Sequence, residues 1–216
     1  MNQQIKKTMD ALKKNNMTPY YAENRFEALE IVKSLINKND LIGLGGSVTL
    51  KEIGATELVR SGGYNIIDRY APDLMPEEKD ECLRRGLLSD VFLTSSNAVS
   101  EKGELINVDG FGNRAAALIY GPKSVVAVVG KNKIVANAEE GFERIKKIAA
   151  PKNCRRLDKK NYCAFKDGCM ALLKEDGSLS DGCGSPSRIC CSYIVQSYQL
   201  IKDRIKVIIC NEDLGY

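Results

Sequence analysis

Apolar residues recur along this chain with two spacings, one typical of helices and one typical of strands. Apolar positions three or four residues apart predict amphipathic helices over residues 3–15, 23–38, 49–60, 76–88 and 137–150. Short runs rich in β-branched residues predict strands over residues 17–22, 41–46, 64–68, 90–95, 103–108, 124–129 and 204–210. Because strands and helices alternate, the pattern predicts an α/β fold with a mostly parallel sheet flanked by helices.

Two parts of the chain interrupt this alternation. Residues 91–135 contain hairpin-like segments, and residues 151–186 are rich in Cys, Gly, Lys and Asp with little periodicity. Pro151 is expected to end the helix before it, because the residue preceding a proline disfavours helical geometry. The runs 188–198 and 204–210 are expected to be strands that rejoin the sheet. We therefore expect a single domain over residues 1–216, with residues 151–191 as a Cys-rich subregion.

The composition narrows the functions that this domain can have. The 216 residues carry a formal charge of +4, and Lys and Arg are interspersed with Asp and Glu, so no basic stripe for nucleic acid is visible. The apolar runs are too short to span a bilayer, and the first residues lack the apolar core of a signal peptide. We therefore expect a cytoplasmic protein with neither nucleic acid nor membrane as a partner.

Histidine is absent from the chain. Its absence excludes Ser-His-Asp and Cys-His catalysis and every imidazole metal site. A general base must therefore be Asp, Glu, Lys or a thiolate, and a site for a soft metal must be built from cysteine.

A glycine-rich turn follows the strand predicted at 41–46. Gly45 and Gly46 precede Ser47 and Thr49, and a helix is predicted directly after them. Glycines can take positive φ and let a ligand approach the backbone, while hydroxyls and helix N–H groups bind phosphate or carboxylate. The alternative is a plain strand–helix turn in which Thr49 and Glu52 form a capping box. Taken alone, these residues favour the plain turn.

A second polar stretch, residues 94–114, follows the strand predicted at 90–95. Its polar residues include Asn97, Glu101, Glu104, Asp109, Asn113 and Arg114. Open α/β sheets bind ligands beyond the carboxyl ends of their strands, so a carboxylate here can act as base or nucleophile, and Arg114 can clamp an acid or phosphate. Alternatively, residues 101–104 and 109–113 are two hairpin turns whose Asp, Asn and Gly serve turn chemistry. The number of hydrogen-bonding groups favours a function.

Six of the eight cysteines lie close together in the sequence, at Cys154, Cys163, Cys169, Cys183, Cys190 and Cys191. In a reducing cytosol such clustering indicates metal or redox chemistry more than disulfides. Four thiolates can hold zinc or an iron–sulfur cluster, but a tight Cys-x-x-Cys pair is missing. A structural metal, a labile cluster, a disulfide pair and simply buried thiols all stay open.

Several of these motifs together resemble the lactate-utilisation (LUD) domain family. They are Gly-Gly-Ser-Val-Thr at 45–49, Ser-Asn-Ala-Val at 96–99 and Asn-Val-Asp-Gly-Phe-Gly-Asn-Arg at 107–114. The resemblance continues through residues 119–122, 129–135, 150–153, 185–190 and 212–216, and so covers nearly the whole chain. It implies a Rossmann-like α/β sheet, similar to that of the ribose-5-phosphate isomerase, glucosamine-6-phosphate deaminase and CoA-transferase superfamily.

The resemblance also implies a ligand site. A small anionic metabolite, belonging to lactate or related organic-acid metabolism, is expected to bind at Gly45, Gly46, Ser47, Thr49, Asn97, Asp109, Asn113 and Arg114. Glu101 is expected near the position of the catalytic glutamate of the CoA-transferases, which is an analogy at the level of the fold.

For the cysteines, the resemblance implies a metal site. The pattern expected in close relatives matches Cys163, Cys169, Cys183 and Cys190, which are predicted to hold an iron–sulfur cluster or zinc, although this chain has an insertion at about residues 170–181. Because family members act in lactate oxidation beside iron–sulfur subunits, iron–sulfur or oxidoreductase subunits are expected partners, and we also expect a homo-oligomer. The alternative function is an accessory electron-transfer or metal-binding protein without catalysis of its own.

Overall fold

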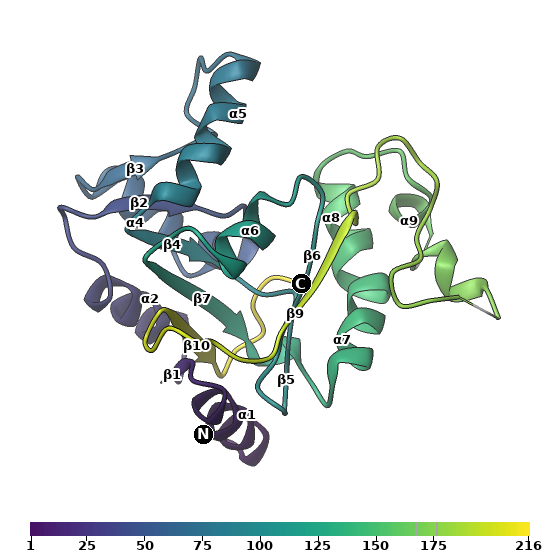
Figure 1. Cartoon of the computed structure of the whole chain (residues 1–216), viewed down its shortest axis with the longest axis horizontal. Helices are drawn as coiled ribbons and strands as arrows, with labels where there is room; N and C mark the ends of the chain where they lie inside the picture. Colours follow the sequence, from purple (N-terminus) through teal and green to yellow (C-terminus); the bar gives the residue numbers. More distant parts are fainter. Residues whose placement is uncertain (167, 176) are drawn as a thin grey trace.

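The computed structural model describes residues 1–166, 168–175 and 177–216, and it contains two β-sheets (Figure 1). The larger sheet has six strands, and every neighbouring pair in it is parallel. Its strand order is β1 (Thr18–Ala22), β10 (Ile205–Cys210), β7 (Ser124–Gly130), β4 (Val91–Thr94), β2 (Leu41–Leu44) and β3 (Asn65–Ile67). The predicted α/β class with a mostly parallel sheet is therefore confirmed.

Helices cover both faces of this sheet, which explains why its strands are apolar on both sides. Along β7, Val126 and Val128 pack into one buried cluster, and Val125 and Val129 pack into another. The first cluster includes residues of α2 (Arg25–Ser34), α3 (Val48–Glu52) and α4 (Ala55–Ser61), and the second those of α1 (Gln3–Lys14) and α6 (Asn113–Ile119). Successive side chains of a strand point to opposite faces, so the alternation follows directly from strand geometry.

The smaller sheet has the strand order β8 (Ile134–Val135), β5 (Ala98–Ser100), β6 (Leu105–Asp109) and β9 (Ser192–Gln196). It packs with α7 (Ala138–Arg144) around Ile106, Phe142 and Ile145. The run at 188–198, which was expected to rejoin the main sheet, instead supplies β9 of this second sheet. Its strands are short, and their separation along the sequence does not indicate which of them pair. The pairing in this second sheet could therefore not be predicted.

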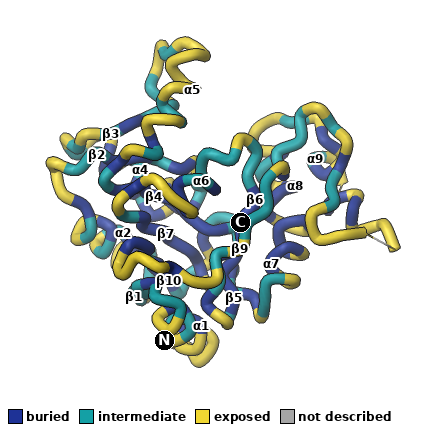
Figure 2. Tube along the Cα trace, in the orientation of Figure 1, coloured by how far each residue is buried: buried dark blue, intermediate teal, exposed yellow. Residues whose placement is uncertain are grey.

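The remaining helices are α5 (Pro76–Arg85), α8 (Ala150–Arg156) and α9 (Tyr162–Phe165). Helix α5 has no buried residue and projects from the body of the molecule (Figures 1 and 2). In the described part of the chain, no helix is both long and apolar enough to cross a membrane.

Two helix boundaries differ from the prediction. The helix expected over residues 49–60 divides at Gly54, whose φ of +80° ends α3 and begins α4. Pro151 does not end the helix before it. It follows a π-helical turn at Ile145–Ala149 and lies in the first turn of α8. The first turn of a helix is the place where the missing N–H of proline costs least.

Candidate functional site

A cavity of about 480 Å³ lies beyond the carboxyl ends of several strands of the main sheet. Residues that follow β2, β4 and β7 form one part of its wall, including Ser47, Asn97 and Lys133. Helix α8 and residues 186–189 form another part, and Tyr216 contributes from beyond β10. This is the edge of an open α/β sheet at which ligands bind.

Residues 46–49 of the predicted turn line this cavity, but the capping box expected of Thr49 and Glu52 does not form. Ser47, not Thr49, caps α3, because its side chain accepts a hydrogen bond of 3.1 Å from the N–H of Leu50. Glu52 accepts the N–H of Gly215 at 2.6 Å and is therefore not part of a capping box. Thr49 therefore does not cap the helix. It lines the cavity and is 1% exposed.

The glycines of this turn serve close packing within the protein. Neither Gly45 nor Gly46 belongs to the glycines with positive φ in the described residues. A Cβ atom on Gly45 would lie 2.8 Å from Thr94 Oγ1, and one on Gly46 would lie 2.7 Å from the hydroxyl of Tyr70. Gly46 lines the cavity, whereas Gly45 lies behind the lining.

Asn97, Asp109, Asn113 and Arg114 also line the cavity, so the structure brings the two predicted polar stretches together. Arg114 donates to the side chains of Asn97 and Asn107 and to the carbonyls of Ser95 and Val108. Burial lowers the pKa of its guanidinium, and Asp109 partly offsets this. Because both terminal nitrogens of Arg114 are used inside the protein, its main contribution to a ligand is positive potential.

The carboxylate of Asp109 binds backbone N–H groups beside the cavity. Its carboxylate accepts the N–H of Gly110 at 3.0 Å and that of Ala115 at 2.9 Å. It thereby binds N–H groups at the start of α6. Residues 109–113 lead into this helix and do not form the hairpin turn that was the alternative interpretation. A carboxylate at a helix N-terminus is stabilised by the helix dipole.

Lys133 is a residue of this site that the sequence did not predict. It is 3% exposed, and its Nζ donates to Thr49 Oγ1 at 2.8 Å and to Ser95 Oγ at 3.0 Å. Burial, together with the charges of Arg144 and Arg114, lowers the pKa of its ammonium to about 7. A buried lysine whose pKa is lowered in this way is characteristic of functional sites. In the sequence it stands in Gly-Lys-Asn-Lys, which suggests an exposed turn.

The charges around the cavity are strongly unbalanced. Its lining contains one acidic residue, Asp109, and six basic residues, namely Arg69, Arg114, Lys133, Arg156, Lys159 and Arg188. Within the described residues, none of the six forms an ion pair with a carboxylate. Unpaired cations along one cavity attract and bind anions.

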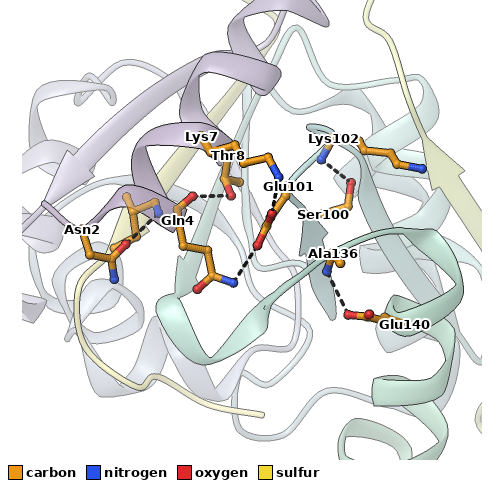
Figure 3. A network of polar contacts seen from close by, with 10 residues as sticks. Asn2, Gln4, Lys7, Thr8, Ser100, Glu101, Lys102, Ala136 and Glu140 are labelled. Atoms are coloured by element: carbon orange, nitrogen blue, oxygen red, sulfur yellow. Dashed lines mark hydrogen bonds and ion pairs between the residues drawn. The ribbon is translucent and has the colours of Figure 1, made fainter.

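Glu101 does not line this cavity, and Figure 3 shows its side chain beside those of Lys7 and Gln4. It follows β5 and accepts hydrogen bonds from Lys7 Nζ at 2.6 Å and Gln4 Nε2 at 2.9 Å, both on α1. The Lys7 and Gln4 hydrogen bonds lower the pKa of its carboxyl below the ordinary value. The structure thus places Glu101 at a contact between α1 and the β5–β6 turn, apart from the other predicted site residues.

The clustered cysteines lie together behind the cavity. Five of them are buried free thiols that line a second, much smaller cavity: Cys154, Cys163, Cys169, Cys183 and Cys190. The shortest sulfur contact among them, 3.6 Å, joins Cys163 to Cys154, which was not in the predicted metal set. Burial and the contact with Cys154 raise the pKa of Cys163 to about 12.

The predicted metal site does not fit this arrangement. The second cavity measures about 10 Å³, which is about the space of one water molecule and far less than an iron–sulfur cluster needs. Among the described residues, no three His, Cys, Asp or Glu side chains are arranged to hold a metal ion. The structure therefore gives no support to an iron–sulfur or zinc site here.

Comparison with known proteins gives a family and structural neighbours. A family model described as "LUD domain" matches residues 5–210. Among solved structures, the chain is similar to a DUF162 family protein from Deinococcus radiodurans, with 15% sequence identity, coverage of 96% of each chain and a TM-score of 0.48. No curated protein matches the chain.

Proposed function

Because the chain belongs to the LUD domain family, we propose that it binds a small organic-acid anion in the 480 Å³ cavity and acts in lactate or related organic-acid metabolism. The observation that carries this proposal is a cavity with one carboxylate and six basic side chains, none of which forms an ion pair within the described residues. An anion supplies the negative charge that the described residues do not provide.

The size and lining of the cavity suit a small ligand. Its volume lies in the range of ordinary small-molecule sites, and its polar groups come from segments that follow strands of the main sheet, from β6 and from α8. Arg156 is exposed on α8, and its guanidinium is held by Asn153 Oδ1 and the hydroxyl of Tyr216. It is therefore positioned at the cavity but not buried, and its charge is available to an entering carboxylate.

Ligand-induced stabilisation tests this function. We expect lactate, pyruvate or related carboxylates to raise the thermal midpoint, because a ligand that binds only the folded state stabilises it. Inorganic phosphate and ribose 5-phosphate in the same panel separate organic acids from phosphorylated ligands. If no anion in the panel changes the midpoint, the proposed function is wrong.

A matched pair of variants on α8 locates the binding. Arg156→Gln should weaken carboxylate binding about fivefold to tenfold, since it removes a charged donor at a partly exposed position. Lys152→Gln, on the exposed side of the same helix and away from the cavity, should leave the affinity unchanged. Equal losses in the two variants would indicate general charge attraction and contradict a site in this cavity. Ser47→Ala is unsuitable here because it removes the cap of α3.

A further inference from the structure

The buried end of the cavity holds a lysine without a carboxylate partner. Lys133 donates only to two hydroxyls, those of Thr49 and Ser95, in the described residues. Glu52 is an acidic residue whose charge acts on Lys133, and its carboxylate already accepts the N–H of Gly215. Buried charges in proteins are normally paired. A buried lysine without such a pair is therefore not expected in a purely structural role.

The hydrogen bonds of Lys133 define the state of its amine. The hydroxyl of Thr49 can donate to the carbonyl of Leu214 at 3.4 Å, and that of Ser95 to the carbonyl of Ser96 at 3.3 Å. Both hydroxyls can therefore accept from Nζ. A neutral amine has two hydrogens, and once both are donated its lone pair is the remaining free position. Burial and the neighbouring charges of Arg144 and Arg114 lower the pKa of the ammonium and so favour this neutral form.

We propose that Lys133 is a nucleophile that condenses reversibly with the carbonyl carbon of an oxo acid bound in the cavity. This inference rests on the proposed binding of organic acids and names their class, a carboxylate that also carries a ketone or aldehyde. A lysine desolvated beside cationic groups is a recognised nucleophile toward carbonyl substrates. Arg156 and Lys159, on the more open part of the wall, attract the carboxylate.

The step balances without any further reactant. The Nζ lone pair forms a bond to the carbonyl carbon, and one proton passes from Nζ to the carbonyl oxygen. The second Nζ proton then passes to that oxygen, the C–O bond breaks, the oxygen leaves as water, and a C=N bond replaces the C=O bond. Water reverses the step and releases the oxo acid. Thr49 and Ser95 lie within 3.0 Å of Nζ and can pass the protons.

Reductive trapping tests this inference on the unaltered protein. Pyruvate or 2-oxobutyrate with sodium borohydride should give one stable adduct per chain, with a mass increase equal to the acid minus one oxygen atom. Peptide mapping should place it on Lys133. Lactate and propanoate, which have no carbonyl group, should give none. An adduct spread over the exposed lysines would overturn the proposal.

Two variants and a binding measurement sharpen the result. Lys133→Arg should lose the adduct, while Lys152→Arg, on the exposed side of α8 and outside the cavity lining, should keep it. If calorimetry shows that pyruvate binds but nothing is trapped, the nucleophile is wrong and anion binding stands. If no carboxylate binds at all, the proposed function itself fails. Because the mapping uses the natural chain, it decides the question even if Lys133→Arg does not fold.

Discussion

At the scale of single residues, the protonation of Lys133 links ligand binding to pH. Its pKa of about 7 lies within the physiological range, whereas Arg144 nearby keeps a pKa of about 10. The groups that face its amine are the hydroxyls of Thr49 and Ser95, together with the charges of Arg114, Arg144 and Glu52. Lys133 is therefore expected to titrate near neutral pH.

We therefore expect the affinity for a simple carboxylate, such as propanoate, to fall as pH rises through 7. The bound anion favours the protonated lysine, so binding takes up a proton, and the affinity falls by at most about tenfold per pH unit. Calorimetry in buffers of different ionisation enthalpy measures this uptake. Lys133→Met should flatten the profile, and an unchanged profile in that variant would assign the effect to another group.

The same lysine should influence stability with pH. Its pKa is lowered in the folded protein from the ordinary value of 10.5, so the unfolded chain binds more protons above pH 7. The contribution of Lys133 to the free energy of unfolding therefore rises with pH from about 7 toward 10 and is lost as pH falls through 7. Urea unfolding at pH 7.0 and 8.5 should show a larger increase for the natural protein than for Lys133→Met. Equal increases would contradict the lowered pKa.

At the scale of elements, one glycine couples α1 to the second sheet. Gly103, in the turn between β5 and β6, has a φ of +79°, and a Cβ there would lie 2.5 Å from the backbone carbon of Ala11. Asn15, just after α1, donates to the carbonyls of Lys102 and Gly103. With the contacts of Glu101, these bonds hold α1 against the turn (Figure 3).

Gly103→Ala should therefore be much more harmful than an alanine at another left-handed glycine. Gly63 has a φ of +69° and no atom within 4 Å of a Cβ, so Gly63→Ala should cost only the backbone strain, about 1 kcal/mol. Gly103→Ala adds a backbone clash and should exceed about 2 kcal/mol. The free energies of unfolding in urea compare the two variants directly. Similar losses would show that α1 shifts to make room for the Cβ atom without a cost in stability.

At the scale of the whole molecule, burial divides the cysteines into two groups. Cys191 is exposed and Cys82 is partly exposed, whereas the five thiols of the second cavity and Cys210 are buried. The five thiols of the second cavity adjoin the ligand cavity, because Ala150 and Ile189 line both cavities.

A thiol reagent should therefore modify Cys191 first in the native reduced protein, followed by Cys82. The five thiols of the second cavity should react only after unfolding in urea, because reagent and water are excluded from them. Mass spectrometry of labelled peptides over time measures the order. Fast labelling of Cys163 or Cys169 would show that this region opens in solution, and anaerobic metal analysis would then be the next measurement.

Part of this architecture follows from local sequence alone. The strands β2, β4, β7 and β10 and the helices α1 and α2 coincide with runs whose apolar pattern is unambiguous, because these strands are buried on both faces and these helices on one. The position of the turn at residues 45–49 followed in the same way, since glycines and hydroxyls directly after an apolar run mark the end of a strand. Motif resemblance correctly supplied the family.

Other features were decided only by tertiary structure. Lys133 becomes a buried amine because β7 ends beside the turn after β2 and the loop after β4, and no local pattern reveals that meeting. Glu101 is held by α1, far along the chain, and Cys154 rather than the predicted partners contacts Cys163. Periodicity reports which face of an element is buried. The neighbours that a side chain meets, and hence its charge state and chemistry, depend on how distant segments pack together.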